Sequence, residues 1–212
     1  MKKIGSLIAA VCMLLLLLTA CGQQAATESS AAAPAHFDPA QVETVADLLP
    51  FLHNSEESQT SANETRYIMA FKADDVYYRA VAEMPEGMYD KISDVEYDDD
   101  HDATVEKMLS PLKVQSVENL NDKIPSQEEL DKLVGKTGQE LFDDGWTYWY
   151  YDLSEMKAGL YGGLFAYDVV FDYDGEPMEN TDDFDFYEEF KDLKVKSVTF
   201  TGLGDAANPD TE

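Results

Sequence analysis

Residues 165–173 read Phe-Ala-Tyr-Asp-Val-Val-Phe-Asp-Tyr, and this stretch shows the folding pattern of the chain most clearly. Aromatic and apolar side chains occupy every second position from Phe165 to Tyr173. This period of two is typical of a β-strand with one buried face. Asp174-Gly175 follows directly as a turn signal. The stretch therefore predicts an antiparallel strand that ends at a tight turn.

A second pair of strands is predicted nearer the N-terminus. Residues 66–72 and 76–84 alternate in the same way, and Ala73-Asp74-Asp75 between them indicates the turn of a hairpin. The first strand is expected to bury Tyr67, Met69 and Phe71. The second is expected to place two sets of side chains on opposite faces, Val76, Tyr78, Ala80 and Ala82 on one and Tyr77, Arg79, Val81 and Glu83 on the other.

Helices are predicted to be few and short. Apolar spacing predicts a helix over residues 42–51 and a pair over 128–134 and 138–142, the last with Thr137 as its N-cap. Asp102 is expected to cap a further helix over residues 103–109. The predicted fold class is α+β, with short helices packed on antiparallel sheet.

An internal repeat links the two halves of the chain. Residues 112–117 read Leu-Lys-Val-Gln-Ser-Val and residues 193–198 read Leu-Lys-Val-Lys-Ser-Val, identical at five of six positions. Because the order of predicted elements also agrees, the sequence indicates a tandem duplication of a helix-then-meander unit. The first repeat is placed at residues 38–120 and the second at 121–203.

The N-terminus carries a targeting signal. Met1-Lys2-Lys3 precedes an apolar run over residues 4–18, which is shorter than the roughly 20 residues of a membrane-spanning helix. Leu18-Thr19-Ala20-Cys21 resembles the lipobox of bacterial lipoproteins. That resemblance implies removal of residues 1–20 and attachment of diacylglycerol to Cys21, on the extracytoplasmic side of the cell membrane. The alternative is an ordinary secretory signal in which Cys21 is incidental.

The segments beside the predicted folded part are polar. Residues 21–37 are expected to form a lipidated, disordered tether with a reach of about 20 Å. Residues 204–212 are expected to form a flexible acidic tail. Cys21 is the only cysteine after residue 20, so no disulfide is predicted within the exported chain.

The net charge of the chain limits the classes of molecule that it can bind. After cleavage 13 basic residues face 43 acidic ones, a net charge of −30. A nucleic-acid binder needs a basic face, so this class is excluded, and docking on anionic lipid is disfavoured. The acyl chains on Cys21 are thus expected to be the whole membrane attachment. A cationic protein or another envelope protein is the expected partner.

The sequence predicts neither a catalytic site nor a cofactor. It contains no nucleophile elbow, no His-x-x-x-His pair and no thiol nucleophile besides Cys21. Asp98, Asp100 and Asp102 are weak candidates for calcium, spaced as at the start of an EF-hand. Ala103 and Leu109 stand where that loop needs Gly and Glu, so this is not an EF-hand. An irregular calcium site and a solvated acidic loop both remain open.

The candidate interaction surface is the aromatic run Trp146-Thr147-Tyr148-Trp149-Tyr150-Tyr151. Strict alternation predicts Trp146, Tyr148 and Tyr150 on one face and Thr147, Trp149 and Tyr151 on the other. One set is expected in the core. The other either packs under neighbouring elements or forms an open contact surface, where Trp and Tyr concentrate binding energy.

The second half also resembles a known family. Residues 129–137 form a predicted helix ending in Gly135-x-Thr137, followed by a short helix over 139–145 and a strand from Trp146. This arrangement resembles β-lactamase-inhibitory-protein-like domains and the small outer-membrane assembly lipoproteins. The resemblance implies a two-layer platform that binds another protein. The expected function is a non-catalytic, protein-binding or inhibitory lipoprotein; the alternative is a ligand- or calcium-binding module of the cell envelope.

Overall fold

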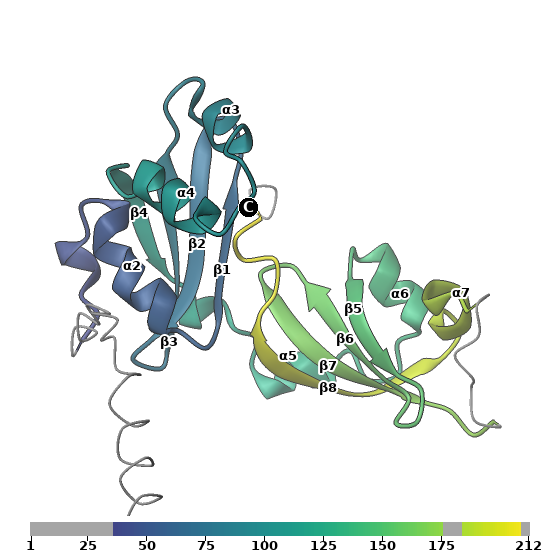
Figure 1. Ribbon diagram of the computed structural model, residues 1–212. Coiled ribbons are helices and arrows are strands. Elements are labelled where there is room, and N and C mark those ends of the chain that lie inside the picture. The colour runs from purple at the N-terminus through teal and green to yellow at the C-terminus, as the bar shows by residue number, and fades with distance from the viewer. Residues whose placement is uncertain (1–35, 176–183, 209–212) are drawn as a thin grey trace, which may run out of the picture. The chain divides into compact units, whose positions relative to one another are not determined.

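The computed structural model describes residues 36–175 and 184–208, which form two four-stranded antiparallel sheets with short helices (Figure 1). Both sheets are meanders, with strand orders β1-β2-β3-β4 and β5-β6-β7-β8. The α+β fold expected from the sequence is therefore confirmed. The predicted leader and tether over residues 1–35 lie outside the described residues.

The elements of the first sheet and its helices, here called the first unit, are η1 (Pro39–Gln41), α2 (Val45–Asn54), β1 (Ser58–Ala62), β2 (Arg66–Ala73), β3 (Val76–Glu83), α3 (Met88–Ser93), α4 (His101–Leu109) and β4 (Val114–Asn119). The second unit contains η2 (Asn121–Lys123), α5 (Gln127–Asp131), α6 (Gly138–Asp143), β5 (Thr147–Asp152), β6 (Lys157–Gly162), β7 (Phe165–Asp172), α7 (Phe186–Phe190) and β8 (Lys194–Leu203). Figure 1 shows α2 and α4 lying over one face of the first sheet.

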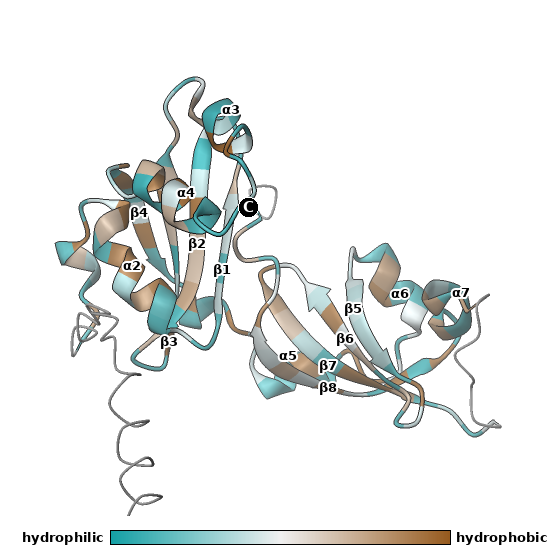
Figure 2. Cartoon of the chain, viewed as in Figure 1, coloured by the Kyte–Doolittle hydropathy of each residue, from teal (hydrophilic) through white to brown (hydrophobic). Residues whose placement is uncertain are grey.

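The alternation predicted for β2, β3 and β7 is confirmed. The inward residues of β2 and β3 pack under α2 and α4 in one apolar cluster that includes Met69, Phe71 and Ala80. In β7, Val169 and Phe171 lie in the core of the second unit. Figure 2 shows helix α2 with hydrophobic and hydrophilic residues on different sides, as expected for a helix that covers a sheet.

Helix starts follow the capping residues. Helix α2 begins three residues later than predicted, because Thr44 and Asp47 form a capping box with the backbone there. Thr137 caps α6 as predicted, together with Glu140. Helix α4 begins at His101 with Asp100 at the N-cap, so the prediction that Asp102 caps this helix is wrong.

The two units share equivalent hydrogen bonds as well as element order. In each, the start of the strand that follows the last helix bridges to the N-cap residue of an earlier helix, Lys113 to Thr44 of α2 and Lys194 to Thr137 of α6. Three further backbone hydrogen bonds recur at equivalent places in the two units. In the first unit they run from Ala46 N to Ser110 O, from Val45 N to Leu112 O and from Val114 N to Glu43 O. Their counterparts in the second unit, in the same order, run from Gln139 N to Lys191 O, from Gly138 N to Leu193 O and from Val195 N to Lys136 O. These contacts support the tandem duplication that the sequence indicates.

The folded part extends beyond both predicted limits. Phe37, assigned to the tether, is 2% exposed and packs edge-on against Phe71 and Tyr78. Residues 204–208, assigned to the flexible tail, pack instead against the second unit, with Ala206 fully buried and Gly204 N bonded to Leu164 O. The short side chains that suggested a frayed end are what allow this close packing.

One carboxylate ties the two units together. Glu57, just before β1, accepts hydrogen bonds from the Tyr77 hydroxyl at 3.0 Å and from the Leu203 backbone N–H at 3.4 Å. Tyr77 also packs edge-on against Phe200 of β8. Within the described ranges, no helix is long and apolar enough to cross a membrane.

We expect the folded chain to lose stability at alkaline pH partly through Tyr77. Burial, together with the hydrogen bond to Glu57, raises the pKa of the Tyr77 phenol to about 12. The unfolded value is about 10. The folded state favours the protonated phenol. Its contribution to the free energy of unfolding is therefore complete below pH 10 and is lost as pH rises toward 12. Urea unfolding at pH 8 and pH 11 should therefore show a smaller loss for Tyr77→Phe than for the parent chain. Equal losses would contradict the assignment, and Tyr97→Phe, at a position that is 90% exposed, serves as the control.

Candidate functional site

The aromatic run lies on β5, the strand at one end of the second sheet. Tyr148 pairs with Leu160 of β6, but Tyr150 pairs with Gly159, so the register shifts by one residue between them. This β-bulge leaves Trp149 as the extra residue on β5. A bulge on an outer strand also hinders pairing of that edge with another chain.

The bulge overturns the predicted faces of the strand. Tyr148 and Tyr151 pack together against Phe186 of α7, on the helix side of the sheet. Trp149 and Tyr150 both lie on the other side, over Gly159. Strict alternation placed Tyr148 with Tyr150 and Trp149 with Tyr151. That expectation is wrong because one extra residue reverses the facing of every side chain beyond it.

Three rings form what we call the aromatic platform: Trp149, Tyr150 and Tyr161. The Trp149 ring lies nearly parallel to that of Tyr161, at 10° with centroids 6.0 Å apart. Tyr150 meets Trp149 edge-on at 4.4 Å. Trp149 is 51% exposed, which is unusual for so large an apolar side chain. The platform is thus an ordered aromatic surface that remains open to solvent.

A glycine makes the platform possible. A Cβ at Gly159 would lie 2.1 Å from the Tyr150 ring and 2.7 Å from the Trp149 ring. Any side chain at that position would therefore push the rings off the sheet. Gly162 likewise leaves room for a ring, because a Cβ there would collide with the ring of Trp146. The Trp146 ring lies on the helix side of the sheet and packs against Tyr167. Trp146 consequently belongs to the core rather than to the open surface.

Polar groups hold Tyr150 in place. Its hydroxyl donates to Asp168 Oδ1 at 2.5 Å, while Lys157 Nζ lies 3.3 Å from Asp168 Oδ2 and 5.6 Å from the Tyr150 ring centroid. Partial burial, with the bond to Asp168, raises the pKa of the Tyr150 phenol. Hydrogen bonding to Tyr150 and Asp168 raises the pKa of Lys157. At neutral pH the phenol therefore stays protonated and Lys157 stays charged.

Sequence reasoning found Trp149 and Tyr150 but missed the rest of this site. Tyr161, Lys157 and Asp168 come from β6 and β7, and no local pattern links them to β5. Gly159 was the available signal, because a glycine inside a strand often marks close approach by another group.

The candidate calcium residues are not brought together as ligands. Asp98 accepts a hydrogen bond from the Asp100 backbone N–H at 3.0 Å, a local turn that leads into α4. Asp100 occupies the N-cap, and Asp102 lies in the first turn of that helix. Among the residues that the structure describes, no three His, Cys, Asp or Glu side chains converge as a metal site would require.

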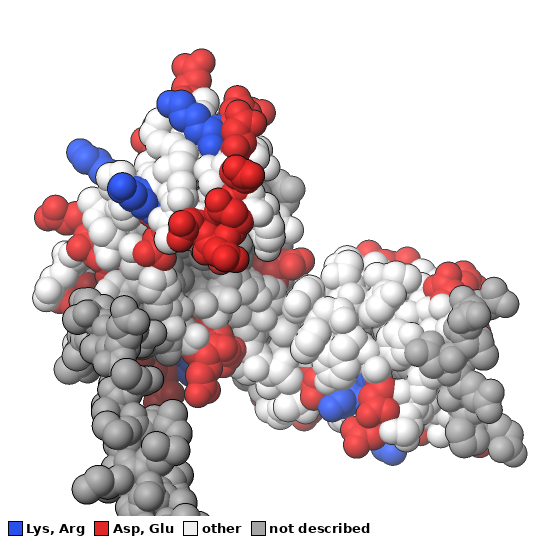
Figure 3. All heavy atoms as spheres, viewed as in Figure 1, with Lys and Arg blue, Asp and Glu red and all other residues white. Residues whose placement is uncertain are grey.

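Acidic side chains dominate the charged surface, as Figure 3 shows for one face. In that view the area over β5 and β6 is largely uncharged, with acidic groups at its borders. Comparisons of the chain with family models, with curated proteins and with solved structures returned no match.

Proposed function

We propose that this chain is a membrane-anchored extracytoplasmic lipoprotein whose folded part binds a protein partner through the aromatic platform. The observation that carries the proposal is the half-exposed Trp149 ring, held in place beside Tyr161 and Tyr150. Trp and Tyr give large contact areas at low entropic cost, and they are enriched among residues that dominate binding energy. Preorganised rings reduce the ordering cost further.

Charge complementarity indicates the kind of partner. The whole chain carries a net charge of −28, so a partner segment with Lys or Arg would be attracted over long range. Guanidinium and ammonium groups also bind favourably to the faces of Trp and Tyr rings. We therefore expect a basic segment with an apolar or aromatic anchor. The partner is a protein rather than a nucleic acid, since phosphate would be repelled.

Attachment through Cys21 would keep this surface near the membrane. The two acyl chains of a lipoprotein anchor bind stably without help from charge. Residues 22–35 contain no aromatic or large aliphatic side chain, as expected of a linker. A tether of this length would let the platform reach partners in the envelope about 20 Å from the head groups.

Affinity capture with matched variants tests the proposal. The full mature lipoprotein in mild detergent should retain a basic envelope protein, and Trp149→Ala should weaken that retention about tenfold or more. Tyr97→Ala is the control, because Tyr97 is 90% exposed but lies outside the platform, in the first unit. High salt should lower retention of the partner. Equal retention by Trp149→Ala and the parent chain, or retention of a polysaccharide only, would contradict the proposal.

A further inference from the structure

Arg79 is the one buried charged residue in the described part of the chain, with an exposure of 7%. It lies on β3 and shares the face of Tyr77 and Val81, opposite the face that packs under α2 and α4. A guanidinium is almost never deprotonated, so Arg79 carries its positive charge into this buried position.

The described residues give this charge no counterion. Its Nη2 donates to the Asn208 backbone carbonyl at 3.2 Å, and its Nε is buried without a hydrogen-bond partner. Glu118 stands directly opposite on β4 but forms its ion pair with Lys123, at 2.7 Å. Thus neither Glu118 nor any other carboxylate within the described ranges forms an ion pair with Arg79.

An unpaired buried charge is costly, and this chain is rich in groups that could relieve it. Burying an ion without a partner destabilises the folded state, and a buried donor without an acceptor adds to that cost. The chain has 43 acidic residues, yet none of the described ones occupies this position. The arrangement is what one expects of a site whose anion arrives from outside.

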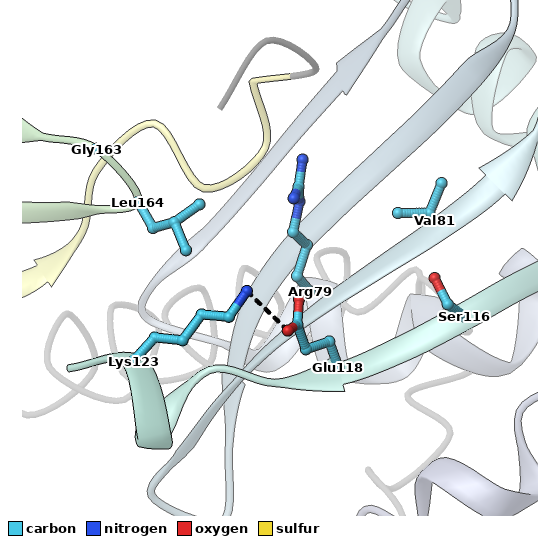
Figure 4. Close-up of a pocket in the computed structure, with 7 residues that line it drawn as sticks. All are labelled: Arg79, Val81, Ser116, Glu118, Lys123, Gly163 and Leu164. Atoms are coloured by element: carbon cyan, nitrogen blue, oxygen red, sulfur yellow. Dashed lines mark ion pairs between the residues drawn. The ribbon is translucent and has the colours of Figure 1, made fainter. Parts of the chain in front are cut away.

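A cavity adjoins the guanidinium. It has a volume of about 530 Å³, within the range of small-molecule sites, and is lined by Arg79, Val81, Ser116, Glu118, Lys123, Gly163 and Leu164. Figure 4 shows Arg79 extending from β3 between Leu164 and Val81, with its guanidinium turned away from the Lys123–Glu118 pair. The lining thus combines this positive group with two apolar side chains, Val81 and Leu164, and with the polar groups of Ser116, Glu118 and Lys123.

We propose that this cavity binds a small organic monocarboxylate. The carboxylate would accept hydrogen bonds from the Arg79 guanidinium, which lines the cavity, in the two-point geometry that guanidinium favours. The apolar part of the ligand would contact Val81 and Leu164. The Glu118 carboxylate in the lining disfavours a second negative charge on the ligand. This ligand site is separate from the aromatic platform and does not depend on the proposed function.

Calorimetric titration of the full mature lipoprotein with hexanoate, and with its neutral analogue hexanamide, tests the proposal. Hexanoate should bind and hexanamide should bind at least tenfold more weakly, because only the carboxylate compensates Arg79. Arg79→Gln should reduce hexanoate affinity at least tenfold. Lys107→Gln is the matched control, with the same change of charge at an exposed position on α4 outside the lining, and it should change hexanoate affinity less than threefold.

A second variant keeps the test valid if Arg79→Gln fails to fold. Ser116 is exposed on β4, so Ser116→Phe should fill the cavity without disturbing the core and should abolish hexanoate binding. Equal affinity for hexanoate and hexanamide would overturn the proposal. Hexanoate binding that persists in both Arg79→Gln and Ser116→Phe would also overturn it. A third contradicting result would be hexanoate binding that appears only after Asp210 and Glu212 are replaced by Asn and Gln.

Discussion

Replacing Cys21 by Ser is expected to release the protein from the membrane completely. Cys21 is the only cysteine of the mature chain, and the lipobox resemblance assigns the lipid to its thiol. Serine cannot form the thioether, so no acyl chains would be attached. After removal of residues 1–20 the chain carries a net charge of −30, so anionic lipid would repel it and no second attachment is expected to compensate. Fractionation of cells that produce the parent chain and Cys21→Ser would measure the change.

The control for this experiment is Cys12→Ser, which removes the other cysteine from within the predicted leader. This variant should remain in the membrane fraction, because the lipid is assigned to Cys21 alone. Retention of Cys21→Ser on the membrane at low salt and its loss at high salt would show that a partner holds the protein there instead. Retention under both conditions would contradict the anchor.

The second large effect is expected from Phe190→Ala. Phe190 is fully buried at the end of α7, stacked on Phe186 and edge-on to Phe171. Truncation of a buried Phe to Ala costs about 3–5 kcal/mol. For a domain of this size, each kcal/mol lowers the melting temperature by roughly 2–4 °C. Thermal unfolding should therefore show a decrease on the order of 10 °C.

Tyr187→Ala is the control for this prediction. Tyr187 lies on the same short helix, is 39% exposed and makes aromatic contacts with Phe142 and Tyr148. Its truncation removes much less buried surface, so the expected loss is about 1 kcal/mol. Similar losses for the two variants would show that α7 is not anchored in the core as the structure indicates.

Strands β2, β3 and β7 were readily predicted from the sequence, because their side chains alternate between two faces. In β2 and β3 both faces are buried, since Ile68, Ala70 and Tyr77 lie in a different apolar cluster from Met69, Phe71 and Ala80. Strand β1 gave no such signal. Its sequence Ser-Gln-Thr-Ser-Ala is polar, and it is a strand because the backbone of β2 offers it hydrogen bonds. Helix α3 was also missed, because it buries no residue completely and so shows no clear apolar face in the sequence.

The site was only partly predictable. Six consecutive residues that all favour strands contain no information about where a bulge falls, so the facing of Trp149 depends on its pairing with β6. The burial of Arg79 depends on residues more than 120 positions away, including Asn208. Such contacts follow from how the two units pack, and no local pattern encodes them.

The most direct measurement of the central claim is site-specific photo-crosslinking in intact cells. A benzoylphenylalanine at exposed position 147, which pairs with Tyr161 of the aromatic platform, would report which molecules contact the platform, and one at exposed position 97 would report random contacts. We predict one protein adduct of basic composition at position 147 that is absent at position 97. Gly159→Ala, which displaces the rings of Trp149 and Tyr150, should diminish that adduct. The same adducts at both positions, or none at position 147, would contradict the proposed role of the platform.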